Sequence, residues 1–297
     1  MNDGARVSIA AARTVAQAIH AASEVLGPRT DSARLDAELL MAHALGASRS
    51  ELFLRRMGDP VPPGFAPLVE RRADREPVAY ILGEAHFWGL RLTVSPAVLV
   101  PRADSETLIE AASTALAKAP PHRILDLGTG SGCLLLAALH EWPGAQGIGI
   151  DRSAQALALA AGNAAQLGLA GRARLIEADW SMQGWAEALG RFDLILANPP
   201  YVESEAALEP TVRDFEPAGA LFAGPDGLDA YRVLVPQLPA LLAPGGLALV
   251  EIGHTQAEAV TAIAAGVGLA SQLHRDLAER PRALQLQIPL GNLPASA

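Results

Sequence analysis

The segment Asp126-Leu127-Gly128-Thr129-Gly130-Ser131-Gly132 follows Arg123-Ile124-Leu125 and precedes a longer apolar stretch at 133–139. This order is typical of a strand that turns sharply into a helix. Alternating glycines permit the turn and let a ligand approach the backbone closely. Cys133 stands where the dinucleotide fingerprint Gly-x-Gly-x-x-Gly needs its third glycine, which disfavours NAD. A P-loop is excluded because no Gly-Lys-Ser/Thr follows.

Apolar strands and helices alternate after this segment. Near-continuous apolar strands separated by helices indicate a largely parallel sheet covered on both faces, a Rossmann-like α/β fold. We expect strands at residues 147–150, 174–177, 192–197 and 247–252, helices at 134–141, 154–167, 231–242 and 256–265, and a turn at 244–246.

The N-terminal part has a different character. Residues from about 10 to 79 predict a small helical domain, and within residues 33–45 the spacing places Leu35, Leu39, Met41 and Ala42 near one face. Residues 80–100 mix β-forming residues with a glycine, which predicts a hairpin.

Two acidic residues end the strands that follow the glycine segment. Asp151 ends the next strand, where an acidic side chain can accept hydrogen bonds from ribose hydroxyls. It could instead cap the following helix, although Ser153 could do this. Asp179-Trp180 follows the third strand and offers an acceptor and an aromatic wall for a base, or a packed core residue.

Asn198-Pro199-Pro200-Tyr201 follows the fourth strand. The prolines fix the backbone and remove two donors, which leaves carbonyl oxygens free to accept. A planar amide or aryl-amine nitrogen is a poor nucleophile, and it needs to be held in line with an electrophilic methyl group. The Asn198 side-chain oxygen and the Pro199 carbonyl could accept its two N–H bonds while Tyr201 packs on the flat group. The motif therefore indicates methyl transfer to a planar nitrogen rather than a plain proline turn.

Further motifs join the glycine segment and Asn198–Tyr201. They are Arg75–Gly83, Phe87-Trp88, Val94-Ser95-Pro96, Val100-Pro101-Arg102, Val212–Pro217, Asp226-Gly227-Leu228 and Glu251-Ile252-Gly253. In these motifs the chain resembles, from Asp31 to about Ile288, the HemK/PrmC family, the N(5)-glutamine methyltransferases that act on peptide chain release factors. The linker differs from the family's usual Arg-Pro-Asp-Thr-Glu, and residues 276–282 lack its usual Gly and Asp.

The resemblance implies a seven-stranded class I methyltransferase domain that uses S-adenosyl-L-methionine. It implies a helical substrate-recognition domain at residues 1–80, a hairpin linker at 81–105 and the methyltransferase domain at 106–297. The substrate would be the glutamine of a Gly-Gly-Gln motif in a release factor. Catalysis and substrate binding would fall to Asn198, Pro199, Pro200 and Tyr201, and cofactor binding to Gly128, Thr129, Gly130, Ser131, Gly132, Asp151, Trp180 and Asn198.

Composition restricts other functions. The net charge is −9, which argues against a protein that binds nucleic acid mainly through phosphates. A single cysteine allows no internal disulfide and no cysteine zinc cage, and we expect no metal. Without a signal sequence or a long apolar run, we expect a cytoplasmic protein with no membrane contact. We also expect a monomer.

Three other functions stay open at this stage. They are methylation of a ribosomal-protein glutamine, N6-methylation of adenine in nucleic acid, and a cofactor-binding scaffold without activity. A cluster of arginines in the helical part could contact an acidic partner or could be a solvated helix face. These arginines are Arg55, Arg56, Arg71, Arg72 and Arg75.

Overall fold

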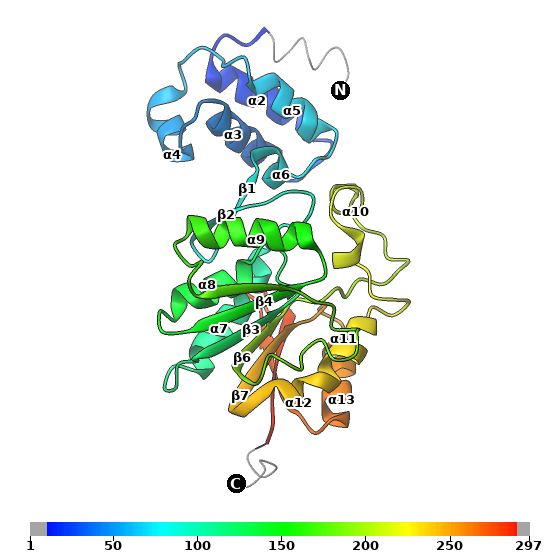
Figure 1. Cartoon of the computed structure of the whole chain (residues 1–297). Helices are drawn as coiled ribbons and strands as arrows, with labels where there is room; N and C mark the ends of the chain where they lie inside the picture. The colour runs from blue at the N-terminus through cyan, green and yellow to red at the C-terminus, as the bar shows by residue number, and fades with distance from the viewer. Residues whose placement is uncertain (1–10, 290–297) are drawn as a thin grey trace. The chain divides into compact units, whose positions relative to one another are not determined.

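The computed structural model of the chain describes residues 11–289 and forms two compact units (Figure 1). The first reaches to Glu84 and includes Leu208–Phe215, and the second comprises Ala85–Ala207 and the chain from Glu216 onward. The division of the sequence into residues 1–80, 81–105 and 106–297 does not anticipate that Leu208–Phe215 group with the helical unit.

The first unit is helical, as the sequence predicts. Thr14 caps its first long helix by accepting a hydrogen bond from the Gln17 amide, and Gly46 turns the chain with φ of +60° after the second. The helices are α2 (Val15–Leu26), α3 (Ala33–Ala44), α4 (Arg49–Glu51), the π-helix η1 (Leu52–Arg56), α5 (Phe65–Ala73), α6 (Val78–Leu82) and α10 (Pro210–Arg213).

The predicted face of α3 is partly wrong. Leu35 is 42% exposed, while Leu40 and Ala37 are buried together with Met41 and Ala42. The helix turns two of its carboxylates inward, and arginines compensate them. Asp36 accepts from Arg72 at 2.6 Å, and Glu38 accepts from Arg34 and Arg49.

Ion pairs involve three of the five clustered arginines. Arg72 is almost fully buried against Asp36, Arg71 pairs with Glu76, and Arg56 pairs with Asp59. These pairs favour the interpretation that the arginines stabilise and solvate the helical unit itself.

The second unit contains a seven-stranded sheet in the order β5-β4-β3-β6-β7-β9-β8. Neighbouring strands from β5 to β7 pair in parallel, and β9 runs antiparallel to both β7 and β8. The strands are β3 (Arg123–Leu127), β4 (Gln146–Asp151), β5 (Ala173–Glu177), β6 (Phe192–Ala197), β7 (Leu242–Glu251), β8 (Ala270–Arg275) and β9 (Pro281–Gln287).

Helices cover both faces of this sheet (Figure 1). Along β6, Leu194 and Leu196 pack in one apolar core, and Ile195 and Ala197 pack in the other. This alternation confirms the Rossmann-like α/β class. The first core contains α7 (Glu106–Ala115), α8 (Cys133–Glu141) and part of α9 (Ala154–Gln166), and the second contains α11 (Asp229–Leu234), η4 (Val235–Gln237), α12 (Leu238–Leu241) and α13 (Ala257–Gly266).

A two-stranded hairpin forms where the sequence predicts one. Its strands are β1 (Glu84–Phe87) and β2 (Leu90–Thr93), and the turn between them has positive φ at Trp88 and Gly89. Two successive residues with positive φ are the geometry that a tight hairpin turn needs. Short 3-10 turns follow later, η2 (Ala103–Ser105) and η3 (Ala218–Ala220).

Two local predictions were wrong. The helix expected at 231–242 is broken into α11, η4 and α12, because Pro236 and Pro239 supply no amide donors. The turn expected at 244–246 lies inside β7, where Phe192 pairs with Leu242 and Leu194 pairs with Leu247. The extra residues of β7 between these two pairs form a β-bulge, and β7 therefore begins at Leu242.

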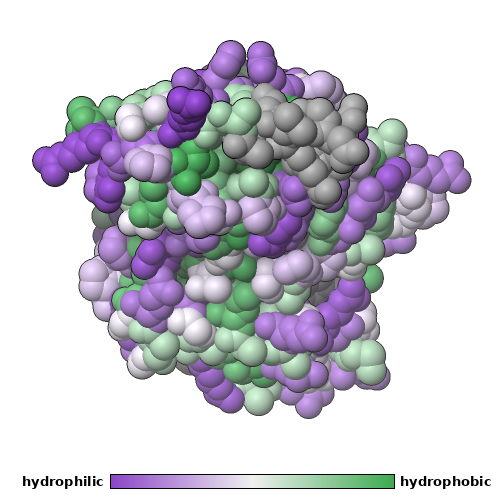
Figure 2. Space-filling model, turned by 90° about the horizontal axis from the view of Figure 1, so that it is seen from above, coloured by the Kyte–Doolittle hydropathy of each residue, from purple (hydrophilic) through white to green (hydrophobic). Residues whose placement is uncertain are grey.

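Large apolar side chains are also exposed at separate places. They are Leu35, Phe53 and Leu54 in the first unit and Met182, Val233, Leu273 and Leu277 in the second. Over the face drawn in Figure 2, hydrophobic residues are interspersed with hydrophilic ones.

The ion pair between Asp36 and Arg72 gives a stability prediction. We expect Asp36→Asn to lower the free energy of unfolding of the helical unit by about 3–5 kcal/mol, because it leaves a buried guanidinium uncompensated. The matched variant Glu76→Gln removes the more exposed pair with Arg71 and should cost about 1 kcal/mol or less. Urea unfolding of both variants checks this, and equal losses would contradict it.

Candidate active site

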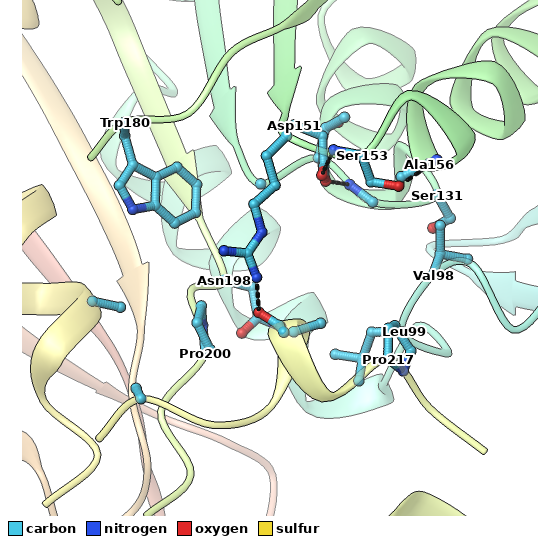
Figure 3. A pocket seen from close by; sticks show the side chains of 18 of the residues that line it. Val98, Leu99, Ser131, Asp151, Ser153, Ala156, Trp180, Asn198, Pro200 and Pro217 are labelled. Carbon is cyan, nitrogen blue, oxygen red and sulfur yellow. Dashed lines mark hydrogen bonds between the residues drawn. The ribbon is translucent and has the colours of Figure 1, made fainter. Parts of the chain in front are cut away.

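A cavity of about 450 Å³ opens at the carboxyl ends of β3, β4 and β6 (Figure 3). Trp180 lies on one side of it, Ser131 and Val98 lie on another, and Asn198 and Pro200 lie between them. Eight residues predicted for the site line this cavity: Gly128, Thr129, Gly130, Ser131, Asp151, Trp180, Asn198 and Pro200. Gly132, Pro199 and Tyr201 are not among the lining residues.

The glycine loop between β3 and α8 has a left-handed backbone at all three glycines. A side chain on Gly128 would approach the Trp180 ring to 3.0 Å, so this glycine makes room for the aromatic wall. A side chain on Gly132 would instead meet Leu136 at 3.1 Å and Ala160 at 3.3 Å. Gly132 therefore allows close packing between α8 and α9, behind the cavity.

A buried carboxylate in β3, that of Asp126, supports the glycine loop. Asp126 is 1% exposed, and its Oδ2 accepts a hydrogen bond from Thr129 Oγ1 at 2.6 Å. Burial raises the pKa of Asp126 to about 7. The loop also donates from the Gly128 and Thr129 amides to the Ile150 carbonyl, which ties it to β4. The hydroxyl of Ser131 is buried, and the Cys133 thiol is the one hydrogen-bond partner it has among residues 11–289.

Asp151 projects from the end of β4. Its Oδ2 accepts from the Gly130 amide at 3.0 Å and its Oδ1 accepts from the Ser153 amide at 2.9 Å. Helix α9 is capped by the Ser153 hydroxyl, which accepts from the Ala156 amide. Each carboxylate oxygen of Asp151 keeps acceptor capacity for hydroxyl groups of a ligand.

Trp180 combines the two interpretations that the sequence left open. Its ring packs against the core that contains α11 and also lines the cavity, and its carbonyl accepts from Gln237 Nε2 at 3.0 Å. Asp179 also lines the cavity, and hydrogen bonds from Ser181 lower its pKa.

The Asn198–Tyr201 motif leaves the end of β6. Asn198 Nδ2 donates to Ser105 Oγ at 3.2 Å, and within residues 11–289 its Oδ1 and the Pro199 carbonyl accept no hydrogen bond. The Tyr201 hydroxyl donates to Glu251 Oε1 at 3.3 Å. Burial raises the pKa of Tyr201 to about 12, so this phenol is neutral and can donate.

Two lining segments were missed as site residues. Residues 97–102 and the stretch around Pro217–Gly224 contribute to the wall. The buried Glu216 joins them by accepting from the Val100 amide and from Arg102. Arg152, which directly follows β4, contacts the second of these segments by donating a hydrogen bond to the Gly219 carbonyl at 3.1 Å. No local pattern reveals contacts between residues more than sixty positions apart.

Two further features, a metal site and a membrane-spanning helix, are not found in the described part of the chain. Residues 11–289 hold no group of three or more His, Cys, Asp or Glu that could bind a metal ion. Nor does any helix in this range have the length and apolar character to span a membrane.

Asp126 gives a prediction for stability against pH. Its folded-state pKa of about 7 lies above the ordinary 3.8, so the unfolded chain releases this proton at lower pH. The contribution of Asp126 to stability is complete below pH 3.8 and is lost as the pH rises toward about 7. We expect Asp126→Asn to reduce the fall in unfolding free energy between pH 5 and 7, by up to about 1.4 kcal/mol per pH unit. Denaturant unfolding across this range measures it, and identical slopes in both proteins would contradict the assignment.

Comparison with known proteins identifies both units. Residues 17–83 match the family described as the PrmC N-terminal domain, and residues 119–269 match a methyltransferase domain family. The catalytic domain of hMettl16 has a related fold, with a TM-score of 0.53 and 13% identity over 68% of this chain and 79% of that one.

Two curated relatives are similar over most of their length. The chain is 45% identical to a release factor glutamine methyltransferase of Rhodospirillum rubrum, over 84% of this chain and 78% of that protein. It is 46% identical to one of Cereibacter sphaeroides, over 87% and 92% of the two chains. The chain belongs to the family of release factor glutamine methyltransferases.

Proposed function

We propose that this protein transfers a methyl group from S-adenosyl-L-methionine to the side-chain amide nitrogen of the glutamine in the Gly-Gly-Gln motif of peptide chain release factors. One observation carries the proposal. Asn198, with an unoccupied side-chain acceptor, lines the same cavity as the glycine loop and Asp151. The names of the relatives supply the identity of the substrate.

The cavity fits the proposed cofactor. Gly128 leaves a cradle that a side chain would fill, and Trp180 forms its wall. Asp151 has acceptor capacity for two ribose hydroxyls, and the Ser131 hydroxyl lines the cavity with no nitrogen or oxygen partner in the described chain. S-adenosyl-L-methionine supplies an electrophilic methyl group when it is bound. Its proposed contacts are Gly128, Thr129, Gly130, Ser131, Asp151, Trp180 and Asn198, with Gly132 shaping the loop.

The substrate amide needs to be oriented, because its nitrogen lone pair is delocalised. We propose that Asn198 Oδ1 and the Pro199 carbonyl each accept one N–H bond of that amide. Pro199 and Pro200 support this arrangement, since they fix the backbone and add no competing donor. Two fixed acceptors hold the nitrogen in one orientation and stabilise positive charge on its hydrogens. Tyr201 does not line the cavity and would support the motif from behind, through its hydrogen bond to Glu251.

The helical unit is the proposed substrate-recognition part. Its match to the PrmC N-terminal domain family favours a release factor over a ribosomal protein as substrate. The net charge of −9 supports a protein substrate over nucleic acid. A monomeric enzyme and a cytoplasmic location stay predictions.

The central test uses purified protein and cofactor labelled in the methyl group. We expect label in a release factor and none when its Gly-Gly-Gln glutamine is replaced by alanine. Ribosomal protein and DNA or RNA are parallel substrates in the same assay. Label in either of these, with none in the release factor, would overturn the substrate assignment.

Asn198→Ala tests the orienting acceptor. We expect kcat to fall by about 10²–10³-fold, because one of two fixed acceptors is lost. Cofactor affinity, measured by calorimetry, should fall far less than kcat, because Asn198 is only one of seven proposed cofactor contacts. A thermal unfolding curve controls for folding. Methylation at near wild-type rate would refute the orienting contact.

Asp151→Ala tests the ribose contact. We expect the cofactor dissociation constant to rise by about tenfold to a hundredfold, since hydrogen bonds to a charged acceptor are lost. Glu177→Ala is the matched control, because it removes an exposed carboxylate at the end of the neighbouring β5. Equal affinity for wild type and Asp151→Ala would remove Asp151 from the cofactor site.

A further inference from the structure

A buried carboxylate lies behind the Asn198–Tyr201 motif. Glu251, the last residue of β7, is 1% exposed and is not among the residues that line the cavity. Its Oε2 accepts from Ser105 Oγ at 2.5 Å, and Ser105 is itself only 2% exposed. Ser105 Oγ in turn accepts from Asn198 Nδ2 at 3.2 Å. Three side chains from distant parts of the sequence thus form one chain of hydrogen bonds.

The other oxygen of Glu251 reaches the opposite end of the motif. Oε1 accepts from the Tyr201 hydroxyl at 3.3 Å. One carboxylate therefore holds Asn198 through Ser105 and holds Tyr201 directly. A side chain that served packing alone would not need hydrogen bonds to both ends of a motif that borders the cavity.

The hydrogen bonds in this chain have a defined direction. An ionised carboxylate only accepts, so the Ser105 proton points to Glu251. The Ser105 oxygen can then only accept from Asn198, which selects the NH₂ end of the Asn198 amide. The Oδ1 end is then directed away from Ser105, and Asn198 is one of the residues that line the cavity. The reverse amide orientation would bring Oδ1 against the serine oxygen, where neither group supplies a proton.

We propose that Ser105 and Glu251 are positioning residues that fix the Asn198 amide with its oxygen toward the cavity. The inference rests on the proposed function, since it assigns a purpose to Asn198 Oδ1 as the acceptor for the substrate amide. Ser105 also lines the cavity, whereas Glu251 does not, and neither is assigned a contact with the reacting atoms. Each acts through Asn198, and Glu251 acts also through Tyr201.

The ionisation state of Glu251 decides the direction of the chain. Burial raises its pKa to about 7, while the Ser105 hydrogen bond and Arg282 lower it. A protonated Glu251 can donate to Ser105, which frees the serine proton for Asn198 Oδ1 and favours the reversed amide. The titratable and charged groups around Glu251 are Asp104, Cys133, Tyr201, Tyr231 and Arg282.

The first experiment compares variants of Ser105 with a matched control. We expect Ser105→Ala to lower kcat on the release factor by about tenfold to a hundredfold, with KM for the cofactor unchanged. Ser105→Thr keeps a hydroxyl and should restore most of the rate. Ser113→Ala removes a buried hydroxyl without a partner from nearby α7 and should leave kcat unchanged. An unaltered kcat in Ser105→Ala would overturn the proposal.

The pH dependence supplies a second measurement, which a purely structural serine would not affect. We expect wild-type kcat to fall as the pH is lowered through about 7. Glu251→Gln keeps the shape and cannot titrate, so this inflection should disappear. An inflection that survives in Glu251→Gln would place the titration elsewhere, for example at Asp126, and would contradict the assignment to Glu251.

A readout without turnover separates this inference from the proposed function. The side-chain amide signal of Asn198, identified by its loss in Asn198→Ala, can be followed by nitrogen-15 NMR. We expect Ser105→Ala to shift it and Ser113→Ala to leave it in place. If the wild type methylates no release factor, the proposed function fails, and this signal still tests the hydrogen-bond chain. If the Asn198 signal does not shift in Ser105→Ala, the proposed chain of hydrogen bonds is wrong.

Discussion

The parallel pairing of β4, β3 and β6 is the constraint on which the cavity depends. Leu127 of β3 pairs with Ile150 of β4 and with Ala197 of β6. The next residue of each strand is therefore Gly128, Asp151 and Asn198, and all three emerge at the same level of the sheet edge. A slip of one residue in either pair would turn the side chains of that strand to the other face. The glycine loop, the acidic acceptor and the orienting amide meet because this register holds.

The register explains which parts of the site can be predicted from sequence. Gly128, Asp151, Trp180 and Asn198 each follow a strand of recognisable apolar character, so the topology of a parallel sheet brings them together. The same reasoning does not reach Ser105 or Glu216, whose partners lie about a hundred residues away in the chain. Contacts of that kind depend on how irregular segments cross the sheet edge, and no periodicity encodes such crossings.

Periodicity also fails where charge or proline competes with it. Spacing alone places Leu35 on the buried face of α3, but the Asp36 and Glu38 carboxylates turn inward to meet arginines from elsewhere in the unit. The bulge in β7 also cannot be predicted from the local sequence. Pro244-Gly245-Gly246 has turn composition, and Gly245 has φ of +79°. A side chain on Gly246 would lie 2.7 Å from the Phe192 carbonyl, so Gly246 allows two strands to approach. The composition is right for both outcomes, and tertiary pairing decides between them.

Buried carboxylates are unusual enough to require a reason at each position. Asp36 faces a buried arginine and contributes to the helical unit, and Asp126 supports the glycine loop through Thr129. Glu251 has no arginine hydrogen-bonded to it either, and it differs from Asp126 because its two oxygens accept from two separate side chains, Ser105 and Tyr201. Ionising a buried carboxyl group costs free energy, and the raised pKa of Glu251 shows that its hydrogen bonds do not fully offset this cost. Stability therefore does not account for a carboxylate at this position. Its hydrogen bonds define the direction in which a neutral amide points, and an apolar side chain has no means of doing this.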